Sequence, residues 1–194
     1  MSVINSAKKE INFKIVYYGP AQSGKTTTLN QLNSSLEASK KSKVKKVVAT
    51  ERTLFFDFLP LSSVEISGYK TKFQVYTVPG QELYENNRRI LLKGVDGVVF
   101  VADSTIDRLE DNIKSLKELV GHLNDMGYKA NEIPLVIQYN KRDLKDAIPV
   151  DELRRTINTL HVPDFETSAI SGDGVLAAFQ ECLRSVVGSL KAMI

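Results

Sequence analysis

Eight residues near the amino terminus have the types and the spacing of a phosphate-binding loop. Residues 19–26 read GPAQSGKT, fit the pattern GxxxxGK followed by Ser or Thr, and directly follow an apolar run at residues 13–18. Glycine at both ends would let successive backbone N–H groups approach phosphate oxygens, and the positive end of a following helix would point at them. Lys25 would neutralise the β- and γ-phosphates, and Thr26 would give its hydroxyl to Mg²⁺. The residues expected to contact a nucleotide here are Gly19, Gln22, Ser23, Gly24, Lys25, Thr26 and Thr27.

A second motif would select the base of that nucleotide. Asn140-Lys141-Arg142-Asp143 has the form NKxD and follows another apolar run. The carboxylate of Asp143 would accept hydrogen bonds from N1–H and the exocyclic amine of guanine, whereas adenine presents an acceptor at N1. Asn140 and Lys141 would brace the base and the phosphate loop. By itself the match also fits a polar turn after a strand, but together with the phosphate loop it predicts a guanine nucleotide.

Two further segments have the residues needed to hydrolyse the γ-phosphate. An N–H group of Gly80 would bond the γ-phosphate, and Gln81 would orient a water for in-line attack. Thr53 would give a second hydroxyl to Mg²⁺, and Arg52 would reach the charge of the transition state. The alternative for Arg52 is a surface arginine that only solvates its loop. The predicted reaction is hydrolysis of GTP to GDP and phosphate.

The composition is that of a soluble globular protein and predicts one domain. The chain has 194 residues, of which 42% are hydrophobic and 25% charged, and its net charge is +3. Acidic and basic residues are interspersed, whereas nucleic-acid-binding proteins concentrate basic residues on one face, so we expect no nucleic acid partner. The exception is residues 40–46, which hold five lysines and no acid. They form either a solvated loop or a contact for an anionic partner or membrane surface.

Cysteine usage and hydropathy predict a cytoplasmic protein without an integral membrane segment. Cys182 is the sole cysteine, so it has no intramolecular disulfide partner, and its apolar surroundings in the sequence predict a core position. No run of eighteen apolar residues is present. We therefore expect any membrane contact to be peripheral or made through a partner.

Strand-like runs alternate with helical patterns along the chain, which predicts an α/β fold. Strands are expected at residues 13–18, 47–48, 54–59, 64–66, 72–78, 95–102, 135–139 and 164–166, and helices at 26–36, 106–126, 150–160 and 174–190. This order predicts a P-loop NTPase domain with a mostly parallel central sheet, an antiparallel edge strand and helices on both faces. The motifs then follow strand ends at one edge of the sheet, where ligands bind.

With these motifs, nearly the whole chain resembles the small GTPases of the Ras superfamily. Glu166-Thr167-Ser168-Ala169 is similar to a segment in which those proteins contact guanine, so the resemblance implies contacts from Ser168 and from the N–H of Ala169, the latter to guanine O6. One branch is more similar, the MglA-type polarity and gliding-motility GTPases of bacteria. The segments that carry this closer resemblance are 14–20, 52–61, 76–81, 93–104 and 137–144.

The resemblance implies a function as well as a fold. It implies a Ras-like G domain over residues 1–194, acting as a nucleotide-driven switch concentrated at one cell pole. It implies a homodimeric roadblock-fold GTPase activator of the MglB type, and polarity or motility effectors that bind the GTP state. It also implies that Arg52 is an arginine finger supplied within the chain and brought into place by that activator.

One position departs from the Ras pattern and leaves a question about the metal. Ras-like proteins have an aspartate near Mg²⁺ where this chain has Thr77. If residues 53–59 are extended, Asp57 lies on the same face as Thr53 and would replace that aspartate; the alternative for Asp57 is a pair with a surface lysine. Two other functions stay open: an adenine-using kinase, disfavoured by the NKxD motif, and a nucleotide-gated scaffold that does not hydrolyse GTP.

Overall fold

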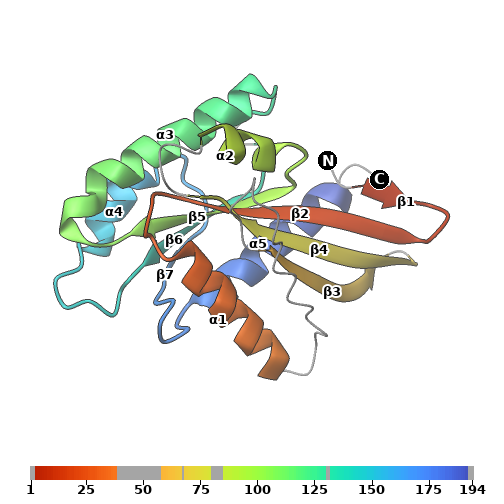
Figure 1. Ribbon diagram of the computed structural model, residues 1–194, viewed down its shortest axis with the longest axis horizontal. Coiled ribbons are helices and arrows are strands. Elements are labelled where there is room, and N and C mark those ends of the chain that lie inside the picture. The colour runs from red at the N-terminus through yellow and green to blue at the C-terminus, as the bar shows by residue number, and fades with distance from the viewer. Residues whose placement is uncertain (1–2, 39–57, 67, 80–84, 130–131, 192–194) are drawn as a thin grey trace.

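The structure is a computed structural model that describes residues 3–38, 58–66, 68–79, 85–129 and 132–191 (Figure 1). Its strands are β1 (Val3–Asn5), β2 (Glu10–Tyr18), β3 (Phe58–Ile66), β4 (Tyr69–Thr77), β5 (Gly97–Asp103), β6 (Leu135–Asn140) and β7 (Asp164–Glu166). Its α-helices are α1 (Lys25–Ala38), α2 (Glu85–Leu92), α3 (Leu109–Asp125), α4 (Val150–Ile157) and α5 (Val175–Lys191), and a 3-10 helix, η2 (Ile106–Arg108), precedes α3. The lysine run at 40–46 and the strand expected at 47–48 lie outside the described residues.

The strands form one sheet in the order β3-β4-β2-β5-β6-β7, with β1 paired to β2 off this path. Pairing is parallel between β4, β2, β5, β6 and β7, whereas β3 runs antiparallel to β4 and β1 runs antiparallel to β2. The expected mostly parallel sheet with an antiparallel edge strand is therefore confirmed. Because β2, β5, β6 and β7 run the same way, their carboxyl ends meet at one edge of the sheet.

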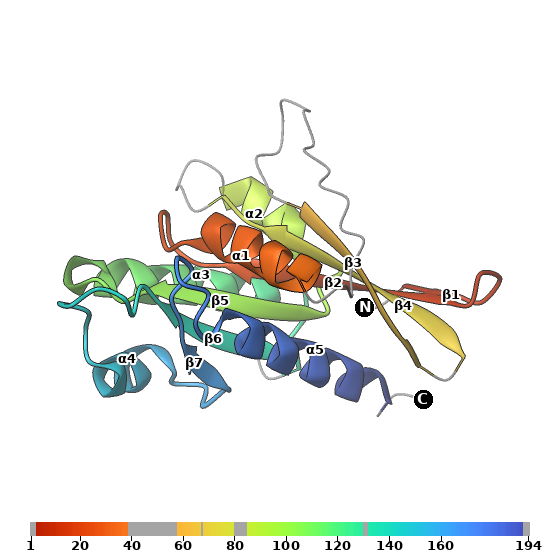
Figure 2. The same cartoon turned by 90° about the horizontal axis from the view of Figure 1, so that it is seen from below.

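Helices cover both faces of this sheet, as expected. Side chains alternate along β2, so that Phe13 and Tyr17 pack with α1 and α5, while Val16 and Tyr18 pack with α2, α3 and α4. Figure 1 shows α2 and α3 above the sheet and α1 below it, and Figure 2 shows α1 and α5 on the face seen from below. Each face thus has its own buried apolar cluster.

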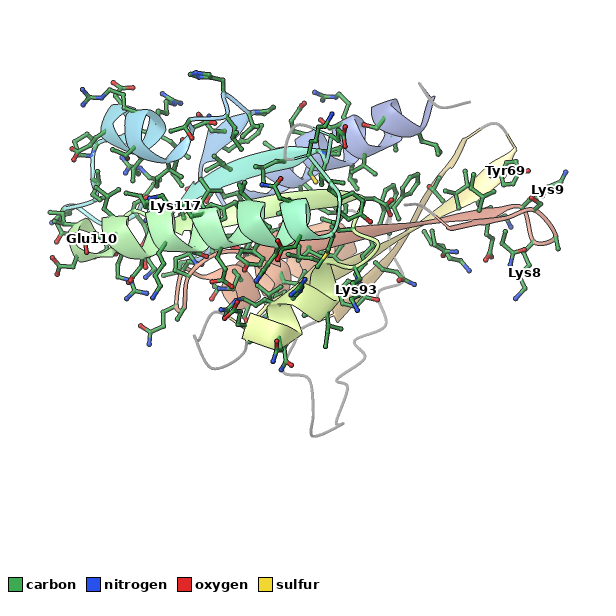
Figure 3. All side chains as sticks on the ribbon, turned by 90° about the horizontal axis from the view of Figure 1, so that it is seen from above. Lys8, Lys9, Tyr69, Lys93, Glu110 and Lys117 are labelled. Carbon is green, nitrogen blue, oxygen red and sulfur yellow. The ribbon has the colours of Figure 1, made fainter. Side chains whose placement is uncertain are left out.

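The two β-hairpins end away from the phosphate loop. Lys8, Lys9 and Tyr69 lie together at that end of the sheet (Figure 3). The same view shows Glu110 and Lys117 on the outward face of α3. The backbone N–H of Lys70 donates to the carbonyl of Lys9 and joins the two hairpins at 2.8 Å. The end of the sheet that carries the motifs is therefore free of these hairpins.

Several element boundaries differ from the sequence expectation. Strand β3 joins residues 58–59, the end of the strand expected at 54–59, to the strand expected at 64–66, with an irregularity between Ser63 and Glu65; residues 54–57 lie outside the described part of the chain. Strand β1 and helix α2 were not expected, because three residues and eight residues are too few for a clear periodic pattern. Helix α4 ends at Ile157, since the Asn158 side chain bonds both the carbonyl and the N–H of Val162 and turns the chain.

The carboxyl-terminal helix packs directly on the middle of the sheet. Cys182 is fully buried there, as expected, and burial raises the pKa of its thiol to about 12. Across the described ranges, no helix combines the length and the apolar character needed to cross a membrane.

Candidate nucleotide site

The phosphate loop connects the carboxyl end of β2 to the first residue of α1. Gly19 has φ of +143°, and a Cβ there would stand 2.3 Å from the carbonyl oxygen of Val101 on β5. Glycine is therefore required, because the backbone of the neighbouring strand fills the space. Gln22, in the middle of the loop, adopts a left-handed conformation with φ of 62° although it is not glycine. The loop is thus a strained turn that its neighbours must hold in place.

Lys25 folds back over this loop. Its Nζ donates to the carbonyl oxygens of Gly19 at 2.9 Å and Pro20 at 2.6 Å, and only 6% of the residue is exposed. Burial, followed by the nearby charges of Arg88 and Arg108, lowers the pKa of Lys25 to about 7. The lysine therefore carries a disfavoured charge that the oxygens of a phosphate would stabilise.

Asn140 joins the phosphate loop to both segments expected to read the base. It ends β6, and its Nδ2 donates to the carbonyl of Ser23 at 2.8 Å. Its Oδ1 accepts from the N–H of Ala169 at 2.9 Å and from the hydroxyl of Thr167 at 3.4 Å. A Cβ on Gly24 would stand 2.2 Å from the same Nδ2, so this glycine leaves room for the bridge. The predicted bracing role of Asn140 thus has a geometric basis.

The turn after β6 is held so that a carboxylate faces solvent. Lys141 adopts a left-handed φ of 70° and places its Nζ 2.6 Å from Oδ2 of Asp103. Arg142 donates to the carbonyl of Ile148 at 2.6 Å and pairs with Glu166 at 3.0 Å. Asp143 is exposed on this fixed turn, so its carboxylate is accessible to solvent.

The segment after β7 is also fixed by its backbone. The N–H of Thr167 donates to the carbonyl of Tyr139, and the carbonyl of Thr167 accepts from the N–H of Arg142. Ser168 accepts from the N–H of Ser171 through its hydroxyl at 3.3 Å. The turns after β6 and β7 are therefore one hydrogen-bonded unit, and the expected contacts from Ser168 and Ala169 lie within it.

The remaining predicted residues divide into two groups. Thr26 and Thr27 are exposed in the first turn of α1, and Thr77 is buried at the end of β4 beside Tyr17 of β2. A hydroxyl oxygen such as that of Thr26 is the type of ligand that Mg²⁺ prefers, so the first turn of α1 suits that metal. The predicted residues that lie outside the described part of the chain are Arg52, Thr53, Asp57, Gly80 and Gln81.

Three charged residues near the loop were missed by the motifs. Arg88 on α2 is 5% exposed and lies close enough to lower the pKa of Lys25. Asp103 ends β5, and Arg108 ends η2 and donates to the carbonyl of Ala21 at 2.6 Å. A carboxylate that ends a fully buried strand is a signal that could have identified Asp103, since buried charges need partners.

Comparisons with known proteins agree with this geometry. The sequence matches the ADP-ribosylation factor family over residues 1–186. It is 50% identical to the mutual gliding-motility protein MglA of Myxococcus xanthus (strain DK1622) over 192 residues, which cover 98% of each chain. It is 29% identical to the ADP-ribosylation factor-like protein 6 of Danio rerio over 177 residues, which cover 87% of this chain and 84% of that protein.

Proposed function

Because this chain belongs to the ADP-ribosylation factor family and is a small GTPase that hydrolyses GTP, we propose that its nucleotide lies across the phosphate loop and the turns after β6 and β7. The observation that carries this proposal is the Asn140 side chain, which bonds Ser23 of the loop and Ala169 of the β7 turn. One side chain thus sets the spacing between a phosphate site and a base site. Lys25 would hold the β- and γ-phosphates, and Asp143 would select guanine.

The base site is tested by changing Asp143→Asn. An asparagine amide would place an N–H donor where the carboxylate accepted a bond, so it would repel the exocyclic amine of guanine and suit the C2 carbonyl of xanthine. We expect at least about tenfold weaker GDP binding and stronger XDP binding, measured by competition with a fluorescent GDP analogue. Lys145→Ala, an exposed change nearby, serves as the control. Unchanged GDP binding in Asp143→Asn would remove Asp143 from the base site.

Mg²⁺ would be held by hydroxyl oxygens and by the nucleotide. When bound, the ion would neutralise charge on the β- and γ-phosphates. The chain supplies the hydroxyl of Thr26 in the first turn of α1, and we propose Thr53 as the second hydroxyl. We propose that Asp57 supplies the carboxylate that Ras-like proteins have at the position of Thr77. The alternative is that Asp57 forms an ion pair with a surface lysine. Hydrolysis then depends on Gln81 to orient the attacking water and on Arg52 to neutralise the transition state.

The cellular role is proposed from the relative of highest identity given above. That protein is named for mutual gliding motility, and we propose that this chain is a switch in cell polarity and gliding motility, active at a cell pole in the cytoplasm. A homodimeric roadblock-fold activator of the MglB type would move Arg52 into place. Polarity or motility effectors would bind the GTP state, because we propose that the segments at 45–58 and 77–89 contact the γ-phosphate and would lose those contacts on hydrolysis. A pull-down that compares GTP-loaded with GDP-loaded protein tests this part.

A further inference from the structure

Asp103 is a buried carboxylate that pairs with Lys141 in the turn after β6, called here the base-reading turn. Only 1% of the residue is exposed. Oδ1 accepts from the N–H of Thr105 at 3.0 Å and from its hydroxyl at 2.6 Å, while Oδ2 lies 2.6 Å from Nζ of Lys141. The side chain of Asn112 bonds both the N–H and the carbonyl of Asp103, each at 2.8 Å. A buried charge held on every side in this way is fixed in position.

Arg108 reaches from the start of α3 to the phosphate loop. Its Nη2 donates to the carbonyl of Ala21 at 2.6 Å, its Nη1 pairs with Asp111 at 2.7 Å, and its Nε lies 3.9 Å from Oδ2 of Asp103. Arginine suits this position because its planar guanidinium donates in several directions at once. The helix expected over 106–126 is interrupted here, since η2 covers Ile106–Arg108 and α3 begins at Leu109. This break turns Arg108 toward the loop.

The bond to Ala21 acts on the strained part of the loop. A trans peptide is planar, with its C=O and N–H pointing in opposite directions. Arg108 holds the carbonyl of Ala21, so it also sets the direction of the N–H of Gln22, the residue with φ of 62°. Asn140 independently donates to the carbonyl of Ser23, two residues further along the loop. The conformation of the loop therefore depends on one side chain from η2 and one from the end of β6.

We propose that Asp103 and Arg108 are a positioning pair that couples the phosphate loop to the base-reading turn and slows nucleotide dissociation. The pair acts through Ala21 on one side and through Lys141 on the other. The inference rests on the proposed placement of the phosphates on residues 19–27. Arg108 also adds positive charge near Lys25, which favours a phosphate there.

The test is the rate at which a fluorescent GDP analogue leaves the protein when excess GDP is added. Loss of a charged hydrogen bond of this kind typically costs enough to change such a rate about tenfold or more, so we expect Arg108→Ala to release GDP at least about tenfold faster. Arg108→Lys should be intermediate, because lysine reaches fewer of the partners. Asp103→Asn should also release GDP faster. The double variant should fall short of the product of the two single effects, because the two residues share one network.

Arg154→Ala is the matched control. Arg154 lies on α4 and pairs with two carboxylates, Asp151 and Asp164, but not with the loop. It should lower the melting temperature without changing GDP release more than about twofold, which separates positioning from general stability. If Arg108→Ala fails to fold, Arg108→Lys carries the test.

Two results would overturn the inference. GDP release within about twofold of wild type in both Arg108→Ala and Arg108→Lys excludes the positioning role. A double variant whose GDP release rate rises by the product of the Asp103→Asn and Arg108→Ala effects excludes the coupling. Lys25→Ala distinguishes a failure of the positioning role from a failure of the proposed function. If Lys25→Ala binds GDP normally, the phosphates do not bind at the loop, and the proposed function is wrong.

Discussion

At the scale of single residues, the ammonium group of Lys25 lies in a site that disfavours its charge. It is buried, it bonds two carbonyl oxygens, and Arg88 and Arg108 repel it. Its pKa of about 7 is therefore set by burial and by like charges together. A bound phosphate would reverse the balance, because an adjacent anion favours the charged form. Nucleotide binding and the protonation of Lys25 should be linked.

We predict that Lys25 takes up a proton when the protein binds GDP at about pH 8. Below about pH 7 the free protein already carries this proton, so the group does not change the affinity with pH there. Above about pH 7, the affinity for GDP should fall as pH rises, by at most about tenfold per pH unit. This fall should continue until the pH reaches the pKa of Lys25 in the complex, which the bound phosphate raises. Titration calorimetry in Tris and in HEPES gives the number of protons, since the two buffers differ in ionisation enthalpy. Equal binding heats in the two buffers would contradict the prediction.

At the scale of elements, α2 is held to α3 by a partly buried ion pair. Nε of Arg88 donates to Oε1 of Glu118 at 2.6 Å, and the hydroxyl of Tyr18 donates to the same oxygen at 2.8 Å. Arg88 also donates to the carbonyl of Pro79 at 3.3 Å. The short helix α2 is therefore held by side chains from β2 and α3, which stabilise an eight-residue segment that is too short to form a helix on its own.

The contact of α5 with the sheet depends on a glycine in β5. A Cβ on Gly97 would stand 2.5 Å from Cγ2 of Val186 and 3.1 Å from Sγ of Cys182. We predict that Gly97→Ala lowers the free energy of unfolding by about 1–3 kcal/mol, because the stiff valine cannot move aside and α5 must shift. Denaturation with urea measures this change.

A second glycine supplies the control for that prediction. Gly121 lies in α3 with open space where its Cβ would be. Gly121→Ala should raise the free energy of unfolding by about 1 kcal/mol, because alanine has the higher helix propensity. The pair Gly97→Ala and Val186→Ala should be less destabilising together than the sum of the two single changes. Strict additivity would mean that the two side chains do not compete for space.

At the scale of the whole molecule, binding and catalysis draw on different parts of the chain. The loop and the turns after β6 and β7 form one hydrogen-bonded unit, in which Asn140 is the central side chain. The proposed catalytic residues, Arg52 and Gln81, belong to other segments of the sequence. A protein built in this way can bind a nucleotide tightly and still hydrolyse it slowly until a partner acts.

We predict that Arg52→Ala and Gln81→Leu keep normal nucleotide affinity but lose activator-stimulated hydrolysis. An arginine finger typically contributes about 10³ to 10⁵ in rate, so its loss should reduce stimulated turnover by a factor in that range. Single-turnover release of phosphate, with and without a roadblock-fold activator, measures both rates. Arg155→Ala, an exposed change on α4, should behave as wild type. Stimulation that survives in Arg52→Ala would place the finger in the partner.

Much of the fold was predictable because its signals are local. The buried runs that became β2, β5 and β6, and the glycine that ends α3, could be recognised from residues that are close in sequence. Gly127 has φ of +81°, and its N–H donates to the carbonyl of Asn124, as expected for the end of a helix. Strand β1 and helix α2 were not predicted because each is short, and the early end of α4 was not predicted because it is set by bonds of the Asn158 side chain to Val162.

The same division holds for the function. Residue types at short spacing were sufficient to predict a guanine-nucleotide site, since a phosphate loop and an NKxD turn each place their groups within a few residues of one another. Tertiary structure alone decided which side chains hold those groups. Arg108 and Ala21 are 87 residues apart, and Arg88 and Glu118 are 30 apart. Such pairs meet only because the strand order of the sheet brings their elements together, and no local pattern records that order.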